Sequence, residues 1–188
     1  MNDKQIRDVL ADRLQCDDTI SMLVHELGIG GGYVRADIAA IKRWGFYGYE
    51  IKSAVDTLSR LPRQVELYSE IFDGCTLVVD GDGRHLDKAL AILPSWWSVV
   101  CVVSTDKIET LKMGRPNPND TCLGKLWLLW KNEIVECLNE IGIKKGISRL
   151  DKKGLRELLL NHLHDETAVR QVVYEKLMNR DNWRKSND

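Results

Sequence analysis

No apolar run in the chain approaches the length of a membrane span, and residues 1–8 lack the hydrophobic core of a signal peptide. Cysteine is sparse and scattered, with 5 residues and no close pair. An odd number of scattered cysteines argues against a disulfide framework and is typical of free thiols in a reducing compartment. We therefore expect a cytoplasmic protein with no membrane partner.

A marked excess of charge of either sign is also missing. The 188 residues include 27 Lys and Arg against 28 Asp and Glu, so the formal net charge is −1 at pH 7. Any affinity for DNA must therefore come from a local basic surface. The hydrophobic share of 44% and the charged share of 29% are the profile of a soluble globular protein. The length fits one domain or a core with a small appendage.

Apolar patterns predict an α/β core in residues 1–105. An amphipathic helix at residues 3–14 is followed by three predicted strands, at residues 22–29, 33–41 and 46–52. These strands form an antiparallel meander whose first turn contains three consecutive glycines. The glycines are not followed by Gly-Lys-Ser/Thr and do not precede a helix, so the run is interpreted as a turn and not as a phosphate-binding loop.

The rest of this core alternates between helices and strands. Its predicted elements are a helix from Pro62 to about residue 72, a buried strand at residues 74–80, a helix at residues 84–93 and a buried strand at residues 97–103. Strands that alternate with helices imply parallel crossovers. We expect a mixed central sheet flanked by helices.

Two carboxylates and a lysine stand out in the meander. Asp37 lies in the second predicted strand, and Glu50 and Lys52 lie in the third. Because side chains on a strand alternate between faces, Glu50 and Lys52 share one face while Ile51 points to the other, into a core. The short connection at residues 42–45 suits a hairpin turn that would bring Asp37 alongside Glu50.

Such a pair of acids calls for a neutralising partner. Two carboxylates about 4 Å apart repel by roughly 4 kcal/mol at an effective dielectric of about 20. A hard divalent cation that prefers oxygen ligands, Mg²⁺ or Mn²⁺, is the partner we expect. It would polarise a phosphate and lower the pKa of its water. Lys52 would orient that water or stabilise charge on the phosphoryl oxygens.

At these residues the chain resembles the PD-(D/E)XK nuclease superfamily, whose signature is an acid on one strand followed by Glu/Asp-x-Lys on the next. Gln64 and Tyr68 lie four apart on one helical face and resemble the Gln-x-x-x-Tyr motif of the RecB-like branch. Residues 49–97 look more closely like an uncharacterised group of bacterial and phage proteins in this superfamily. The resemblance implies a restriction-endonuclease-like αβββαβ core and a Mg²⁺-dependent DNA nuclease. Its catalytic residues would be Asp37, Glu50, Lys52, Gln64 and Tyr68.

The chain departs from the superfamily pattern at two points. A further acid is often present before the first motif, and Asp8, Asp12 and Glu26 compete for that role; Glu26 is preferred because it directly precedes the Asp37 strand. Some RecB-like relatives hold an iron–sulfur cluster through a cysteine triplet and a distant cysteine. The scattered cysteines of this chain predict no such cluster.

The same residues also have a simpler interpretation. An acid on one strand and Glu-x-Lys on the next can form a solvated face with cross-strand ion pairs. A catalytically inactive module with the nuclease fold, which binds DNA or a protein partner, is the alternative function. For an active enzyme, DNA repair or recombination, phage DNA processing and defence are all open roles, and a homodimer is an open assembly.

After a predicted linker at residues 106–124, residues 125–188 are expected to be helical, including a helix at residues 126–141. Residues 133–143 and 152–159, joined by a basic connection, look like the helix, extended loop, helix unit of SAP-type DNA-binding motifs. A solvated connection between helices is the equal alternative. The expected DNA contacts are Arg63 in the core and Lys144, Lys145, Arg149, Lys152 and Lys153 here, with Arg156 adding to the positive charge.

Overall fold

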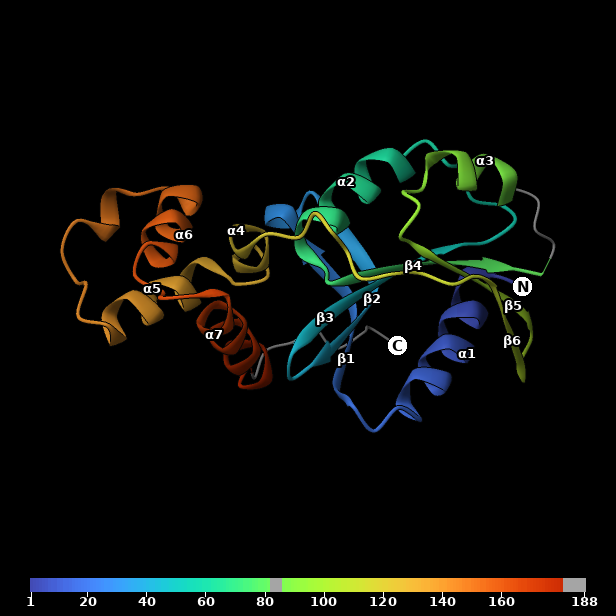
Figure 1. The fold of residues 1–188 in the computed structure, drawn as a ribbon, viewed down its shortest axis with the longest axis horizontal. Helices are drawn as coiled ribbons and strands as arrows, with labels where there is room; N and C mark the ends of the chain where they lie inside the picture. Colours follow the sequence, from blue (N-terminus) through green and yellow to red (C-terminus); the bar gives the residue numbers. More distant parts are fainter. Residues whose placement is uncertain (82–85, 181–188) are drawn as a thin grey trace. The chain divides into compact units, whose positions relative to one another are not determined.

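The computed structural model describes residues 1–81 and 86–180, and the chain divides into two compact units, Met1–Asp120 and Thr121–Asp188. The first unit is built around a six-stranded sheet in the order β1-β2-β3-β4-β5-β6 (Figure 1). Its strands are β1 (Ile20–Ile29), β2 (Val34–Lys42), β3 (Gly45–Lys52), β4 (Gly74–Asp80), β5 (Ser98–Ser104) and β6 (Lys107–Lys112).

The sheet is mixed, as the sequence predicts. Strands β1, β2 and β3 form an antiparallel meander. Strands β3, β4 and β5 are parallel to one another, and β6 returns antiparallel to β5. The helices of this unit are α1 (Asp3–Gln15), α2 (Leu61–Ile71) and α3 (Leu86–Ile92). The expected αβββαβ order is therefore present, although residues 84 and 85 of the predicted third helix lie outside the described residues.

The two faces of the sheet are covered by different helices, with α1 on one face and α2 and α3 on the other (Figure 1). On the α1 face, Ile6 and Leu10 pack in a buried cluster with Ile38 of β2 and Ile51 of β3. Because neighbouring residues of a strand point to opposite faces, the residues on either side of Ile51, which are Glu50 and Lys52, point toward α2.

The turn between β1 and β2 needs the glycine run. The three residues form a short 3-10 turn, η1 (Gly30–Gly32), and their φ angles are 59°, 79° and 95°. Residues with a Cβ atom rarely adopt these values, so glycine gives the turn its shape with the least strain. The prediction that the run is a turn is confirmed.

The segment predicted as a linker, residues 106–124, contains strand β6 and the start of a helix. β6 lies at the edge of the sheet and most of its residues are exposed, so it is held by backbone pairing with β5 and not by a buried apolar face. A strand of that kind leaves little hydrophobic alternation in the sequence, which explains why the pattern did not predict it.

The second unit is helical, as expected. Its elements are α4 (Cys122–Leu126), α5 (Lys131–Glu140), η2 (Ile147–Arg149), α6 (Lys152–Leu160) and α7 (Glu166–Met178). The single helix predicted at residues 126–141 is wrong: α4 ends at Leu126 and α5 begins at Lys131. Glu133 accepts a hydrogen bond from the backbone N–H of Trp130 and so caps the start of α5. The apolar residues of two helices had been combined into one pattern.

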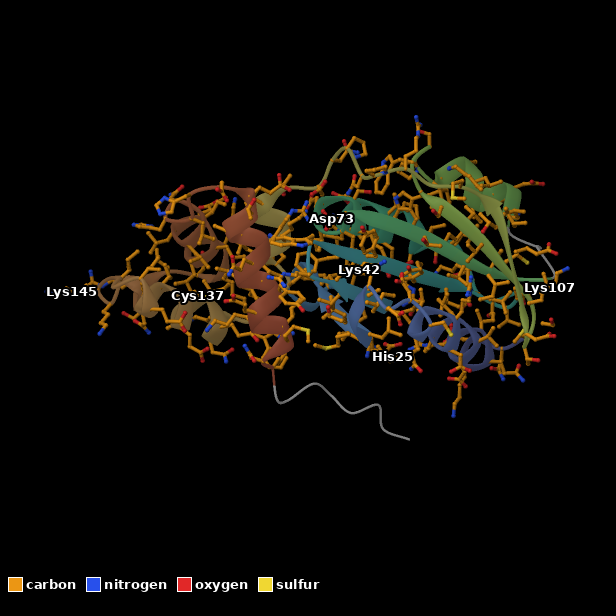
Figure 2. The ribbon with its side chains drawn as sticks, turned by 60° about the horizontal axis from the view of Figure 1, so that its bottom comes forward. His25, Lys42, Asp73, Lys107, Cys137 and Lys145 are labelled. Carbon is orange, nitrogen blue, oxygen red and sulfur yellow. The ribbon has the colours of Figure 1, made fainter. Side chains whose placement is uncertain are left out.

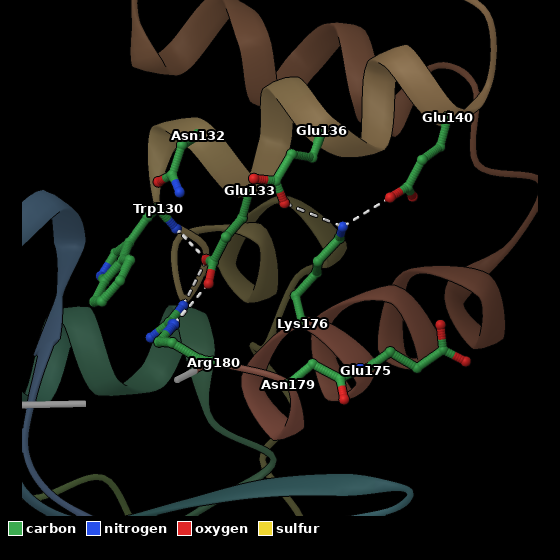
Figure 3. A pocket seen from close by; sticks show the side chains of 9 residues that line it. All are labelled: Trp130, Asn132, Glu133, Glu136, Glu140, Glu175, Lys176, Asn179 and Arg180. Carbon is green, nitrogen blue, oxygen red and sulfur yellow. Dashed lines mark hydrogen bonds and ion pairs between the residues drawn. The ribbon is translucent and has the colours of Figure 1, made fainter. Parts of the chain in front are cut away.

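Ion pairs connect α5 with α7 and with Arg180, which follows α7, and the pair formed by Arg180 is buried. Arg180 donates to both carboxylate oxygens of Glu133, at 2.7 and 2.6 Å, and to the carbonyl of Leu128, and its guanidinium stacks on the ring of Trp130 (Figure 3). A pocket of about 510 Å³ beside this pair is lined from α5 and α7. Within it, Lys176 forms ion pairs with Glu136 and Glu140.

Along the described residues, no helix is both long enough and apolar enough to cross a membrane.

Candidate catalytic and metal-binding site

The five predicted catalytic residues converge on one place in the first unit. Asp37 comes from β2, Glu50 and Lys52 from β3, and Gln64 and Tyr68 from α2. All except Tyr68 line a pocket of about 690 Å³, and Tyr68 reaches Glu50 from behind it. The order and spacing in the sequence therefore did identify neighbours in space.

Asp37 lies where β2 and β3 begin to separate. The last paired residues of the two strands are Ile38 and Tyr49, and Asp37 Oδ2 accepts a hydrogen bond from the backbone N–H of Ile51 at 2.7 Å. Its side chain is 19% exposed, enough to present the carboxylate to the pocket. Burial, and next to it the charge of Glu50, raises the pKa of Asp37 to about 7.

Glu50 lies deeper in the site, with 1% of its surface exposed. Its Oε1 accepts a hydrogen bond from Lys52 Nζ, and its Oε2 accepts one from the hydroxyl of Tyr68 at 2.8 Å. Burial raises the pKa of Glu50, and the neighbouring donors oppose that rise. A carboxylate has about four lone-pair sites, so Glu50 retains some acceptor capacity after these contacts.

Tyr68 and Gln64 flank Glu50 from α2. Burial raises the pKa of Tyr68 well above its ordinary value, so its hydroxyl stays protonated and acts as a donor. Gln64 is 6% exposed and also hydrogen-bonds to Glu50 through its side chain. Its Oε1 is buried and has no hydrogen-bond partner among the described residues. A buried amide oxygen without a donor is costly for the fold.

The donor set of this pocket suits a hard divalent cation. The carboxylates of Asp37 and Glu50 are oxygen ligands of the type that Mg²⁺ prefers. The described residues contain no group of three or more His, Cys, Asp or Glu side chains arranged to hold a metal. The candidate site therefore consists of two acids with polar neighbours.

Glu26, the preferred third acid, lies in the same pocket but is engaged by arginines. It forms ion pairs with Arg7 and Arg35, and its φ angle of 54° is unusual for a residue with a side chain. Its competitors Asp8 and Asp12 are exposed on α1 and do not line the pocket.

Arg7 is a residue of the site that sequence analysis missed. From α1 its guanidinium contacts Asp3 at 3.0 Å, Glu26, and Asp37 at 3.4 Å. It is therefore a cation already present beside the carboxylate proposed as a metal ligand. The only signal in the sequence is the spacing of four residues between Asp3 and Arg7, which is common on exposed helices and carries no indication of a site.

The residues predicted to contact DNA lie in both units. Arg63 lines the pocket with its side chain 57% exposed. The remaining five are exposed and lie in or beside the connection between α5 and α6; they are Lys144, Lys145, Arg149, Lys152 and Lys153. Figure 2 labels Lys145. This segment contains two helices, α5 and α6, joined by a connection that includes η2.

Arg156 does not contribute to that exposed positive charge. It is 2% exposed, donates to the backbone carbonyls of Leu126 and Leu129, and stacks on the ring of Trp127. Counting it with the basic connection was wrong, because its position on α6 turns the guanidinium into the interior of the helical unit. Its partners are backbone carbonyls, which a sequence pattern does not reveal.

Comparison with known proteins places the chain in a phage family. No curated protein gave a significant match. Among solved structures, the SPO1766 protein of unknown function from Silicibacter pomeroyi is similar to this chain, with 16% sequence identity and a TM-score of 0.40. The similar region covers 57% of this chain and 68% of the SPO1766 chain. The family described as bacteriophage P4 protein cII matches residues 3–187. The chain therefore belongs to the bacteriophage P4 protein cII family.

Proposed function

We propose that the protein is a Mg²⁺-dependent nuclease of the PD-(D/E)XK superfamily that hydrolyses DNA phosphodiester bonds. The observation that carries the proposal is the convergence of Asp37, Glu50 and Lys52 from two strands with Gln64 and Tyr68 from α2. Surface ion pairs do not explain this arrangement, because Glu50 and Lys52 are 1% and 4% exposed.

Each side chain has a role that follows from its contacts. Asp37 and Glu50 would hold the cation, which supplies Lewis acidity toward the phosphate and its water. Tyr68 fixes one oxygen of Glu50, so the other faces Lys52 and the pocket. Lys52, which pairs with Glu50 in the metal-free site, would donate to the attacking water or to the phosphoryl oxygens. Gln64 helps to hold Glu50 in place through its side-chain hydrogen bond.

The biological role is proposed at the level of DNA metabolism. The family to which the chain belongs is described by a bacteriophage protein, which supports phage DNA processing over repair, recombination or defence. The exposed lysines between α5 and α6 support a DNA grip in the second unit, in the manner of a SAP-type motif. A cytoplasmic site of action is part of the same proposal.

A cleavage assay tests the activity. Purified protein is incubated with linear, circular and single-stranded DNA in Mg²⁺ or Mn²⁺. We expect cutting that disappears with EDTA and with Asp37→Asn or Lys52→Ala, because each change removes one part of the site. The matched control is Asp8→Asn, an exposed acid on α1 outside the pocket. Cutting that survives both site substitutions would come from a contaminant and would refute the assignment.

A catalytically inactive DNA- or protein-binding module is the second candidate function. It is favoured by the two internal cations, since Arg7 faces Asp37 and Lys52 pairs with Glu50. These contacts could neutralise both acids permanently. Binding of Mn²⁺ discriminates between the two functions, because an active nuclease site must bind the ion and a catalytically inactive site need not bind it.

A further inference from the structure

The walls of the pocket come from two separate segments. One wall is the η1 turn and the start of β2, with Tyr33 and Arg35. The other is the segment that leads into α2, with Arg60 and Arg63. The acids and Lys52 lie on the floor between them. Any phosphate that reaches the floor must therefore pass between these two walls.

Both walls carry guanidinium groups. The side chains of Arg35 and Arg63 are 61% and 57% exposed, and their ion pairs with Glu26 and Glu66 are of the weak, solvent-exposed kind. Arg60 is exposed, and its side chain forms no ion pair or hydrogen bond with the described residues. These groups are free to turn toward an anion, and arginine is the side chain best suited to phosphate.

The other acids of the pocket are already bound to protein groups. Asp3 and Glu26 contact Arg7, and Asp56 accepts hydrogen bonds from the backbone N–H and the hydroxyl of Ser53 at 2.8 and 2.7 Å. Their charges are therefore partly compensated within the fold. The charges of the pocket that are least compensated within the fold are thus those of the exposed arginines on the walls.

An exposed aromatic ring, that of Tyr33, lines the pocket. Tyr33 directly follows the three glycines and is 86% exposed, although most tyrosine rings cover apolar surface. No aromatic pair or cation–π contact involves it among the described residues. An unpaired ring beside a line of arginines is the combination with which proteins bind single-stranded nucleic acid, by stacking a base and holding the phosphates.

The size of the pocket limits what can enter. Its volume of about 690 Å³ is that of a small-ligand site, and its floor residues Glu50 and Lys52 are almost fully buried. A phosphate within a paired duplex carries its neighbouring base pairs with it and is held away from such a floor. A strand with unpaired bases can bend its backbone between the walls.

We propose that the site takes an unpaired DNA strand, with Tyr33 stacking a base and Arg35, Arg60 and Arg63 holding phosphates on either side of the floor. This substrate class rests on the proposed nuclease function but is tested apart from it. It predicts binding in the absence of any divalent ion, because the walls belong to the chain itself.

The test is fluorescence anisotropy of the full chain in EDTA, with a short unstructured single strand and the blunt duplex that contains it. Tyr33→Ala should weaken binding of the single strand by about 5- to 100-fold, whereas Tyr33→Phe, which keeps the ring, should not. Arg60→Gln should reduce the slope of log K against log salt by about 0.7 for the single strand. Binding of the duplex should change in neither variant.

Two control variants match the substituted residues. Trp44→Ala removes another exposed ring, at the opposite end of β2, and Arg13→Gln removes an exposed arginine of α1 outside the pocket. The inference is overturned if Tyr33→Ala and Arg60→Gln behave like these controls, or weaken the single strand and the duplex equally. Failure of Mn²⁺ binding or of cleavage would instead overturn the proposed function and leave the strand-binding result standing.

Discussion

Tyr68 in α2 donates a hydrogen bond to Glu50 in β3, with 2.8 Å between the hydroxyl oxygen and Glu50 Oε2. The ring of Tyr68 also packs against Phe72 and Trp97, at centroid distances of 5.1 and 5.6 Å. The residue therefore links the core between α2 and the sheet to the candidate site. Its hydroxyl belongs to the site, and its ring belongs to the core.

Tyr68→Phe separates those two roles. The ring is kept, so the fold should be retained, but Glu50 loses a donor that stabilises its charged form. Hydrogen bonds to charged groups are worth about 1.5–3 kcal/mol, so we expect affinity for Mn²⁺ to fall by about 10- to 100-fold in calorimetry. The control is Tyr49→Phe, whose ring packs on the α1 face of the sheet. Equal affinities in the two variants would contradict a role for the Tyr68 hydroxyl.

Lys52→Met should destabilise the metal-free protein. Lys52 pairs with Glu50 in a site where the side chains are 4% and 1% exposed, and its removal leaves a buried carboxylate without its cation. Such a loss costs about 3–5 kcal/mol of unfolding free energy, measured with urea. The double variant Glu50→Gln/Lys52→Met should recover much of that loss.

The matched control for this pair is Lys107→Met. Lys107, labelled in Figure 2, pairs with Glu109 two residues away on β6, but the two side chains are 60% and 47% exposed. The loss there should be too small to measure, because an exposed ion pair contributes little to stability. Similar losses at Lys52 and Lys107 would mean that the buried pair contributes no more than a surface pair.

The free energy of unfolding of the metal-free protein should depend on pH through the titration of Asp37. The pKa of Asp37 is raised from 3.8 to about 7, so the folded protein binds this proton more tightly than the unfolded chain. Its contribution to stability is full below the unfolded pKa and is lost as the pH rises through about 7. In EDTA, Asp37→Asn should therefore gain unfolding free energy relative to the parent protein as the pH rises from about 5 to about 8. A constant difference between the two proteins would show that Asp37 has an ordinary pKa.

The second unit should depend on its buried ion pair. Arg180 and Glu133 have side chains that are 2% and 7% exposed, and Arg180→Ala would leave the carboxylate buried alone. We expect hydrogen exchange of α5 and α7 to accelerate by a factor that corresponds to about 3–5 kcal/mol. Lys153→Ala, which removes an exposed pair with Glu157, should leave exchange unchanged. Unchanged exchange in Arg180→Ala as well would refute the structural role of the pair.

Sequence patterns predicted the candidate site well because its residues follow simple periodicities. Glu50 and Lys52 share a face through the alternation of a strand, and Gln64 and Tyr68 share one through the spacing of a helix. The short hairpin then places Asp37 next to Glu50. The meander and the parallel crossovers were predicted for the same reason, since their core strands bury continuous or alternating apolar residues.

The parts that sequence patterns missed have two causes. Arg7 reaches Asp37 across 30 positions, and Arg156 is buried by backbone carbonyls some 30 positions earlier, so no short window of sequence contains these contacts. Strand β6 and the break between α4 and α5 are local, but one is held by backbone pairing and the other by the cap from Glu133, and neither produces an apolar period.

Calorimetric titration of the metal-free protein with Mn²⁺ tests the central claim most directly, because it examines the pair of Asp37 and Glu50 without requiring a substrate. We predict a single site in the parent protein and in Asp8→Asn, and loss of that site in Asp37→Asn and in Glu50→Gln. Absence of binding in the parent protein, or equal binding in Asp37→Asn, would contradict the account.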